Sequence, residues 1–164
     1  MSKKIKRTDH YEATPDAVLA MLSDSEYVAA KYQSLGDSST EILEHTTTDT
    51  AMTLKVDRQV PSDLPDFAKK VLGETNHLVQ TESWMKAGDG WVCDLKIESP
   101  GKPLTIGSRS EIVPSGDGSD WNVDMEIKAS IPLVGGKLEG VVEKETLASM
   151  DKEYGFNKVW LSSH

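Results

Sequence analysis

The sequence predicts an α+β fold in which an antiparallel sheet is closed by one long C-terminal helix, and three observations support this. Short segments of alternating apolar and polar residues are separated by glycine- and proline-rich turns, which is typical of antiparallel strands with one face in water. Pro132 ends the last of these segments, and an amphipathic run then continues almost to the C-terminus. Near the N-terminus, Thr14 followed by Pro15 has the composition of a helix start. A sheet covered by one long helix can enclose an apolar interior.

A strand over residues 3–12 comes first, and its side chains alternate with period two. One face of this strand carries Ile5, Arg7, Asp9 and Tyr11. A helix then begins at Pro15. The Ser23-Asp24-Ser25 segment can cap a second helix, and Gly36 ends it.

Residues 39–47 and 50–60 predict a hairpin, and its second strand has the cleanest alternation in the chain. One face of that strand carries Met52, Leu54, Val56 and Arg58. A short amphipathic helix over residues 64–72 follows, with Ser62 or Asp63 as candidate caps. This helix is either a structural cap over one end of the sheet or a mobile lid over a pocket.

Four further strands are predicted near residues 75–87, 91–98, 104–114 and 119–130, because strong turn compositions separate them. In the last of these strands one face carries Trp121, Val123, Met125, Ile127 and Ala129. The faces of the strand at 75–87 are ambiguous. We expect the inner face to consist of Val79, Thr81, Ser83 and Met85 rather than Leu78, Gln80, Glu82 and Trp84.

Composition and charge exclude several classes of partner. The 164 residues predict one domain, 1–164, and 37% hydrophobic with 27% charged residues is typical of globular proteins. The net charge of −9 argues against nucleic acid and against electrostatic docking on anionic lipid. We interpret the basic cluster of Lys3, Lys4, Lys6 and Arg7 as the solvated edge of the first strand rather than as a partner surface.

Cys93 is the single cysteine, so an internal disulfide and a multi-cysteine metal site are excluded. There is no apolar run of 18 residues and no segment like a signal peptide, so we expect a cytoplasmic protein without stable membrane insertion. No catalytic or nucleotide-binding motif is present, and no two histidines have metal-ligand spacing. We therefore expect no metal and no cofactor.

Polar residues stand out by position in three places: Arg58 on an apolar strand face, Glu145 within the apolar stripe of the final helix, and Arg7 with Asp9 on the strand face that carries Ile5 and Tyr11. They are either satisfied structural groups or the polar end of a ligand cavity. Glu145 is also the best candidate for a general base, a role that would need burial to raise its pKa. Ser108 and Ser110 lack the context of a nucleophile and are interpreted as serines on a solvated strand face.

Several motifs, together with the order of elements, carry a resemblance to a known family: residues 56–61 (VDRQVP), 64–65 (LP), 72–73 (LG), 82–84 (ESW) and 131–139 (IPLVGGKLE), with Asp24, Tyr27 and Lys31. They resemble the bacterial family DUF2505 of the START-like (SRPBCC, Bet v 1-like) superfamily. The resemblance implies a helix-grip fold, a seven-stranded antiparallel sheet wrapped around the C-terminal helix with a cavity between them. Relatives in the superfamily bind lipids, sterols or polyketides, and some are cyclases. The family implies no catalytic residue for this chain.

The leading hypothesis is therefore a binding module for a small, mostly apolar molecule that is lipid-, sterol- or polyketide-like. The alternatives are a cyclase or hydrolase that uses the same cavity, and a protein-interaction domain with a filled core. The residues that we expect to contact the ligand are Leu54, Val56, Arg58, Phe67, Val71, Val123, Met125, Leu138, Val141, Val142 and Glu145.

Overall fold

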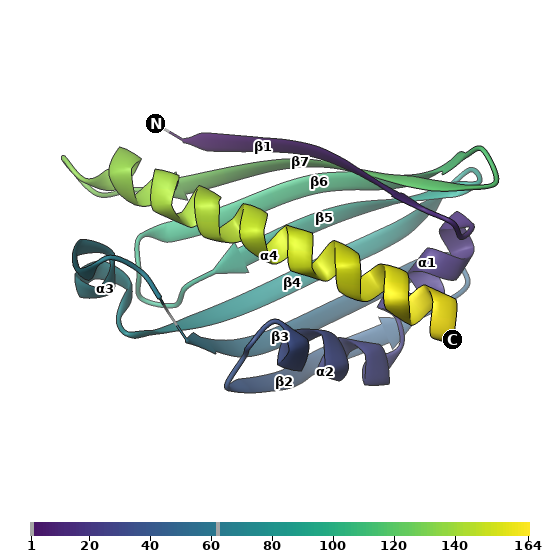
Figure 1. The fold of residues 1–164 in the computed structure, drawn as a ribbon, viewed down its shortest axis with the longest axis horizontal. Helices are drawn as coiled ribbons and strands as arrows, with labels where there is room; N and C mark the ends of the chain where they lie inside the picture. The colour runs from purple at the N-terminus through teal and green to yellow at the C-terminus, as the bar shows by residue number, and fades with distance from the viewer. Residues whose placement is uncertain (1, 62) are drawn as a thin grey trace.

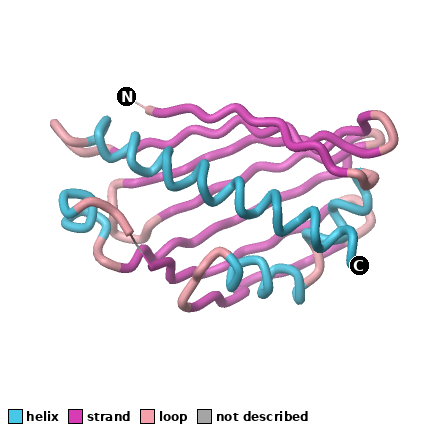
Figure 2. Tube along the Cα trace, viewed as in Figure 1, coloured by secondary structure: helices cyan, strands magenta, loops and turns pink. Residues whose placement is uncertain are grey.

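The computed structural model describes residues 2–61 and 63–164, and it consists of a seven-stranded sheet with one long helix across one face (Figure 1). The strands lie in the order β1-β7-β6-β5-β4-β3-β2, and every neighbouring pair is antiparallel. Helices α1 and α2 lie near the C-terminal end of α4, whereas α3 lies near its N-terminal end (Figure 2). This is the predicted α+β helix-grip arrangement. The elements are β1 (Lys3–Tyr11), α1 (Pro15–Leu22), α2 (Ser25–Ser34), β2 (Ser39–Thr47), β3 (Ala51–Pro61), α3 (Asp66–Leu72), β4 (Thr75–Ala87), β5 (Gly90–Glu98), β6 (Leu104–Ser115), β7 (Gly118–Ala129) and α4 (Gly135–Ser163).

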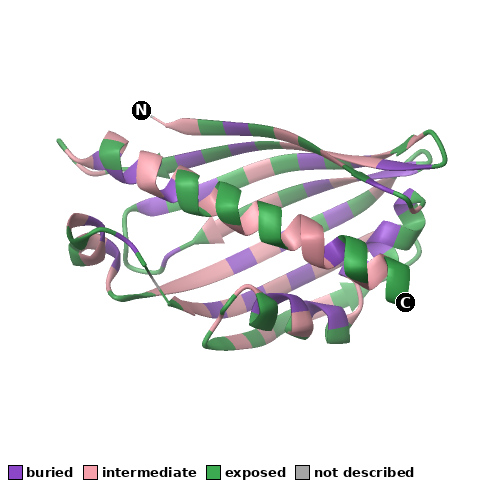
Figure 3. Cartoon of the chain, in the orientation of Figure 1, coloured by how far each residue is buried: buried purple, intermediate pink, exposed green. Residues whose placement is uncertain are grey.

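Buried side chains form two clusters, and burial along the elements is drawn in Figure 3. The first, the α2-side core, joins α1 and α2 to the sheet and to the C-terminal part of α4; its buried members are Tyr11, Val18, Leu19, Met21, Leu22, Tyr27, Val28, Tyr32, Met52, Leu54, Val56, Trp84, Trp91, Cys93 and Ile112. The second, the α3-side core, joins α3 and the N-terminal part of α4 to β1, β6 and β7; its buried members are Ile5, Leu64, Ala68, Leu72, Leu104, Ile106, Met125, Ile127, Ala129, Leu138 and Val142.

The predicted caps of the first two helices are confirmed. Thr14 accepts a hydrogen bond from the Ala17 backbone N–H at 3.2 Å, and Asp24 accepts one from the Glu26 N–H at 2.9 Å. Gly36 follows α2 with φ of +98°, a conformation that favours glycine. Local sequence therefore sets the bounds of both helices.

Asp63, one of the two predicted caps of α3, does not cap this helix. The helix begins at Asp66, Pro65 occupies the N-cap position, and no side chain of the residues that the structure describes caps it. Ser62, the other candidate, lies outside the described residues. The helix ends at Gly73, which adopts φ of +86°. Proline restricts the backbone before the helix and supplies the start signal instead of a hydrogen bond.

The expected inner face of β4 is also wrong. In the register of β3 with β4, Trp84 lies opposite Met52 and Leu78 lies opposite Arg58. Directly opposite residues of an antiparallel pair share a face of the sheet, so Leu78, Gln80, Glu82 and Trp84 point inward with the apolar face of β3. Met85, which belongs to the set that we expected inside, is 63% exposed.

The N-terminal end of α4 lies very close to the end of β7. A Cβ atom at Gly135 would lie 2.7 Å from the Ala129 carbonyl oxygen, so only glycine allows this approach. Glu139 is fully buried one turn later and accepts a hydrogen bond from the Ala129 N–H at 2.9 Å. The motif at residues 131–139 therefore fastens the helix to the sheet.

The C-terminal part of α4 is fastened through Asn157, which is 1% exposed. Its side-chain oxygen accepts a hydrogen bond from the Tyr27 hydroxyl at 2.5 Å, and its amide nitrogen donates one to the Tyr11 hydroxyl at 3.1 Å. These bonds connect α4 with both α2 and β1. The helix is thus held at both ends, while its middle lies over the sheet between the two cores.

Candidate functional site

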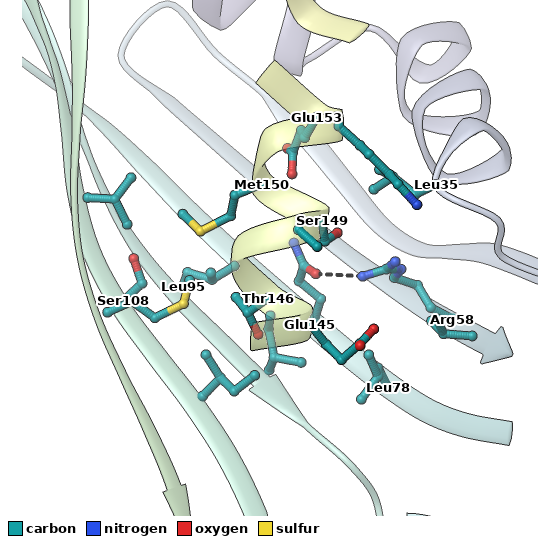
Figure 4. A pocket seen from close by; sticks show the side chains of 18 of the residues that line it. Leu35, Arg58, Leu78, Leu95, Ser108, Glu145, Thr146, Ser149, Met150 and Glu153 are labelled. Atoms are coloured by element: carbon teal, nitrogen blue, oxygen red, sulfur yellow. Dashed lines mark hydrogen bonds between the residues drawn. The ribbon is translucent and has the colours of Figure 1, made fainter. Parts of the chain in front are cut away.

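A cavity of about 480 Å³ lies between the inner face of the sheet and the middle of α4 (Figure 4). From α4, Glu145, Thr146, Ser149, Met150 and Glu153 line it. From the sheet, apolar residues of β4, β5 and β6 form its floor, among them Leu78, Leu95, Ile97 and Ile106. A volume of this size is typical of small-molecule sites, which range over roughly 300–1,000 Å³.

The hollow exists because the middle of the sheet carries small inward residues. Cys93 of β5 lies opposite Ser110 of β6, and Ser108 lies two positions away on the same face of β6. The prediction that both serines lie on a solvated face is therefore wrong, since both line the cavity and Ser110 is 8% exposed. Trp84 and Trp121 come from β4 and β7, the strands that flank β5 and β6. Their rings contact each other, with centroids 5.5 Å apart and an interplanar angle of 68°.

Arg58 is buried at the α2 side of the cavity. Its Nε and Nη2 donate to the two carboxylate oxygens of Asp37 at 2.8 and 2.9 Å, and its Nη1 donates to the Gln80 amide oxygen at 3.4 Å. The guanidinium also lies 4.2 Å from the centre of the Tyr32 ring. Arg58 is therefore a satisfied group that still borders the cavity, and its ion-pair partner is Asp37 rather than Glu145.

Glu145 lines the cavity but is an exposed residue. Figure 4 shows it at the same end as Arg58 and Leu78. The burial that a general base at this position would need is not observed.

Two more ionisable groups, Lys31 and Glu153, lie near the same end, and of the two Glu153 lines the cavity. Lys31 of α2 is 3% exposed, and its Nζ lies 3.2 Å from a carboxylate oxygen of Glu153. Burial lowers the pKa of Lys31, but the charge of Glu153 and the neighbouring tyrosines raise that pKa overall, to well above the ordinary value for lysine. The ammonium group also lies 4.5 Å from the centre of the Tyr32 ring. Tyr32 thus lies between two cations, Lys31 and Arg58.

Glu82 is the third ionisable group, a cavity-lining residue of β4 that is 8% exposed. Burial raises the pKa of its carboxyl group above the ordinary value, and the charge of Lys31 opposes that shift. No Lys, Arg or His nitrogen in the described ranges lies within 4.0 Å of this carboxyl group. Glu82 is therefore a buried acid without a direct counter-ion.

The predicted binding residues fall into two groups. The residues that line the cavity are Arg58, Val123, Met125, Val142 and Glu145. The others lie in or against the two cores: Leu54 and Val56 in the α2-side core, Leu138 in the α3-side core, and Phe67, Val71 and Val141 packed against the α3-side core. Whether any of them contacts a ligand stays a prediction.

Sequence reasoning missed Gln80, Glu82 and Glu153 as cavity-lining groups, and Lys31 as the buried partner of Glu153. The inner face of β3 is clear from its alternation. Pairing β4 with β3 in the observed register places both Glu82 and Gln80 on that inner face. Lys31 was visible as a charged residue in an otherwise apolar helix stripe.

The cavity offers apolar walls, aromatic rings and ionisable groups. Within residues 2–61 and 63–164, no three His, Cys, Asp or Glu side chains come together in a way that could hold a metal ion. None of the helices described here has the length and apolarity that a membrane crossing requires.

The model of the family described as "Protein of unknown function (DUF2505)" matches residues 6–161. Solved structures with the same fold include a protein from Thermus thermophilus, with 13% identity, a TM-score of 0.68 and 98% of both chains covered. A START superfamily protein from Mycobacterium smegmatis has 16% identity and a TM-score of 0.57, covering 98% of this chain and 97% of that one. The Zhui aromatase/cyclase from Streptomyces sp. R1128 has 15% identity and a TM-score of 0.62, covering 96% and 94%. No curated protein matches the sequence. At these identities the structures show a common fold.

Proposed function

This chain belongs to the DUF2505 family, and we propose that it binds a small, mostly apolar molecule in the cavity between the sheet and α4. The observation that carries the proposal is the cavity of about 480 Å³ with apolar residues over most of its floor. Protein interiors normally pack at the density of organic crystals, so a hollow of this size requires a reason. A ligand that fills it supplies one.

The ligand class that we propose is lipid-, sterol- or polyketide-like, in a bacterial cytoplasm. The fold is shared with a START superfamily protein and with an aromatase/cyclase, which supports this class. The polar side chains of Arg58, Glu82 and Glu153 line one side of the cavity. They would orient a single polar group of such a ligand.

Binding is favoured over catalysis because the acid that was the candidate base, Glu145, is exposed. A carboxylate that acts as a general base is normally shielded from water by burial, and Glu145 lacks that burial. Binding is therefore the function that the geometry supports best.

We propose a structural capping role for α3 at the other end of the cavity. Ala68 and Leu72 of α3 are 0% and 2% exposed, and the preceding Leu64 lines the cavity. Two fully buried anchors in a helix of seven residues favour a fixed cap over a mobile lid.

The test fills the cavity by mutation. Ser108→Phe places a large side chain inside the hollow, whereas Arg109→Phe places the same side chain on the exposed face of β6. We expect apolar ligands from a lipid and polyketide panel to raise the melting temperature of the wild type and of Arg109→Phe, but not of Ser108→Phe. Native mass spectrometry would detect a copurified ligand in the same two proteins. Equal ligand responses in all three proteins, or none in the wild type, would overturn the proposal.

A further inference from the structure

The charged groups around the cavity do not balance. Lys31 is paired with Glu153, and Arg58 is held by both oxygens of Asp37. Glu82 is the remaining buried charged group of this cluster, and no cation of the described residues lies within 4.0 Å of it. Two cations therefore face three carboxyl groups, which leaves an excess of one acid at the cavity wall.

The rest of the lining adds acid rather than base. The other ionisable acids that line the cavity are Asp9, Asp63 and Glu145, and the other base is Lys152. Asp9 is neutralised by Arg7 at 3.0 Å, whereas Asp63, Glu145 and Lys152 are exposed. Both cations of the buried cluster, Lys31 and Arg58, are already paired with a carboxylate. Neither is therefore free to receive an anionic ligand.

Aromatic rings border the same space as Glu82. Trp84 follows Glu82 on the inner face of β4, and its ring centre is 5.5 Å from that of Trp121. Tyr11 lies against Trp121, with ring centroids 6.4 Å apart, and all three rings line the cavity. The faces of such rings carry partial negative charge and attract cations.

We propose that the molecule bound in this cavity carries a protonated amine, with Glu82 as its counter-ion and the aromatic rings around it. This inference rests on the proposed function and names the polar group of its ligand. A carboxylate or phosphate ligand is disfavoured, because its charge would be placed beside an unbalanced acid after both neighbouring cations have been used. An ammonium group instead supplies the missing positive charge.

The experiment compares three probes with one aromatic body: naphthylethylamine, naphthylethanol and naphthylacetate, titrated into the wild type by calorimetry at neutral pH. A hydrogen bond to a charged group contributes about 1.5–3 kcal/mol, so we expect the amine to bind about 10- to 100-fold more tightly than the alcohol. The acid should bind more weakly than the alcohol. A trimethylammonium probe and its neutral tert-butyl analogue repeat the comparison with a permanent charge.

Glu82→Gln keeps the shape of the side chain and removes its charge. We expect this variant to lose the preference for the amine and to bind the alcohol as the wild type does. Glu111→Gln, on the exposed face of β6, should keep the preference. If all probes bind equally well, or the acid binds best, the amine inference fails and the proposed function stands. If no probe binds and Ser108→Phe also has no effect on the wider ligand panel, the proposed function itself fails.

Discussion

The two cores hold the two ends of α4 by different chemistry. Around the α2-side core, buried polar groups are paired with one another, as in the contact of Lys31 with Glu153. The α3-side core is mostly aliphatic, and Glu139, which is buried at the same end of α4, accepts a hydrogen bond from the Ala129 backbone N–H. A buried ion pair contributes little net stability, because desolvation offsets its attraction, whereas aliphatic burial contributes stability directly. The α3 side therefore holds its end of α4 mainly by apolar packing, whereas the α2 side also uses buried polar pairs.

The largest expected effect is on the α3 side. Leu138 is fully buried and does not line the cavity. Leu138→Ala should lower the free energy of unfolding by about 3 kcal/mol, because a buried leucine and its packing are lost, and should leave probe affinity unchanged. Urea denaturation and calorimetric titration measure the two quantities. Leu147→Ala, at a 38% exposed position of the same helix, is the control and should change stability by less than about 0.5 kcal/mol. A large loss of affinity in Leu138→Ala would mean that the two ends are not separable.

The next effect concerns the ion pair on the α2 side. Glu153→Gln leaves the Lys31 ammonium buried without an ionised partner, which should cost about 2 kcal/mol since Glu153 itself is partly exposed. Adding Lys31→Met to this variant should restore most of the loss, because the uncompensated charge is removed. Urea denaturation of the two single variants and the double variant measures this coupling. Glu145→Gln is the matched control on α4. A double variant that is less stable than Glu153→Gln would contradict the assignment.

Glu82 makes the stability of the α2 side depend on pH. Burial is the main reason that the pKa of Glu82 is raised in the folded state, so folding favours the protonated carboxyl group. The contribution of this group to the free energy of unfolding is therefore fully present below the ordinary pKa of 4.5, and it is lost as the pH rises through the pKa of the folded state. Lys31 and Arg58 oppose this loss, and Glu153 increases it. We expect Glu82→Gln to gain melting temperature relative to the wild type as the pH rises from 4 to 8. A difference between the two proteins that is flat over this range would exclude a buried, shifted acid.

The smallest effect is expected again on the α3 side. The Lys137 ammonium lies 4.3 Å from the centre of the Phe67 ring, and Lys137 is exposed. Lys137→Met should therefore cost only about 0.5–1 kcal/mol in urea denaturation. Lys144→Met, at another exposed position of α4, gives the baseline. A loss well above 2 kcal/mol would show that charge also holds this end, and the contrast between the two cores would disappear.

The fold was predictable because its signals are local. Thr14 and Asp24 cap helices by contacts within a few residues, and the alternation of β3 identifies its inner face without knowledge of its neighbours. The glycine at position 135 allows the close approach of α4 to the Ala129 carbonyl oxygen, which no larger residue would permit.

The candidate site was less predictable because its residues depend on register between strands. Glu82 and Ser83 are adjacent, and composition alone does not say which of them faces inward. The choice is made by pairing with β3, where Glu82 lies opposite Leu54. Ser108 and Ser110 were misplaced for a related reason. Small polar residues are typical of a wet face, and here they form the floor of a hollow.

The attachment of α4 at Gly135 and at Asn157 also determines what can vary in this molecule. The height of the helix above the sheet is set by contacts of backbone and buried amide at the two ends, outside the middle turns. Substitutions between Glu145 and Met150 can therefore change the side chains of α4 that line the cavity without changing the distance between α4 and the sheet. For the ligand that we propose, the fixed attachment of α4 would limit its thickness, and the replaceable side chains of α4 would select its polar group.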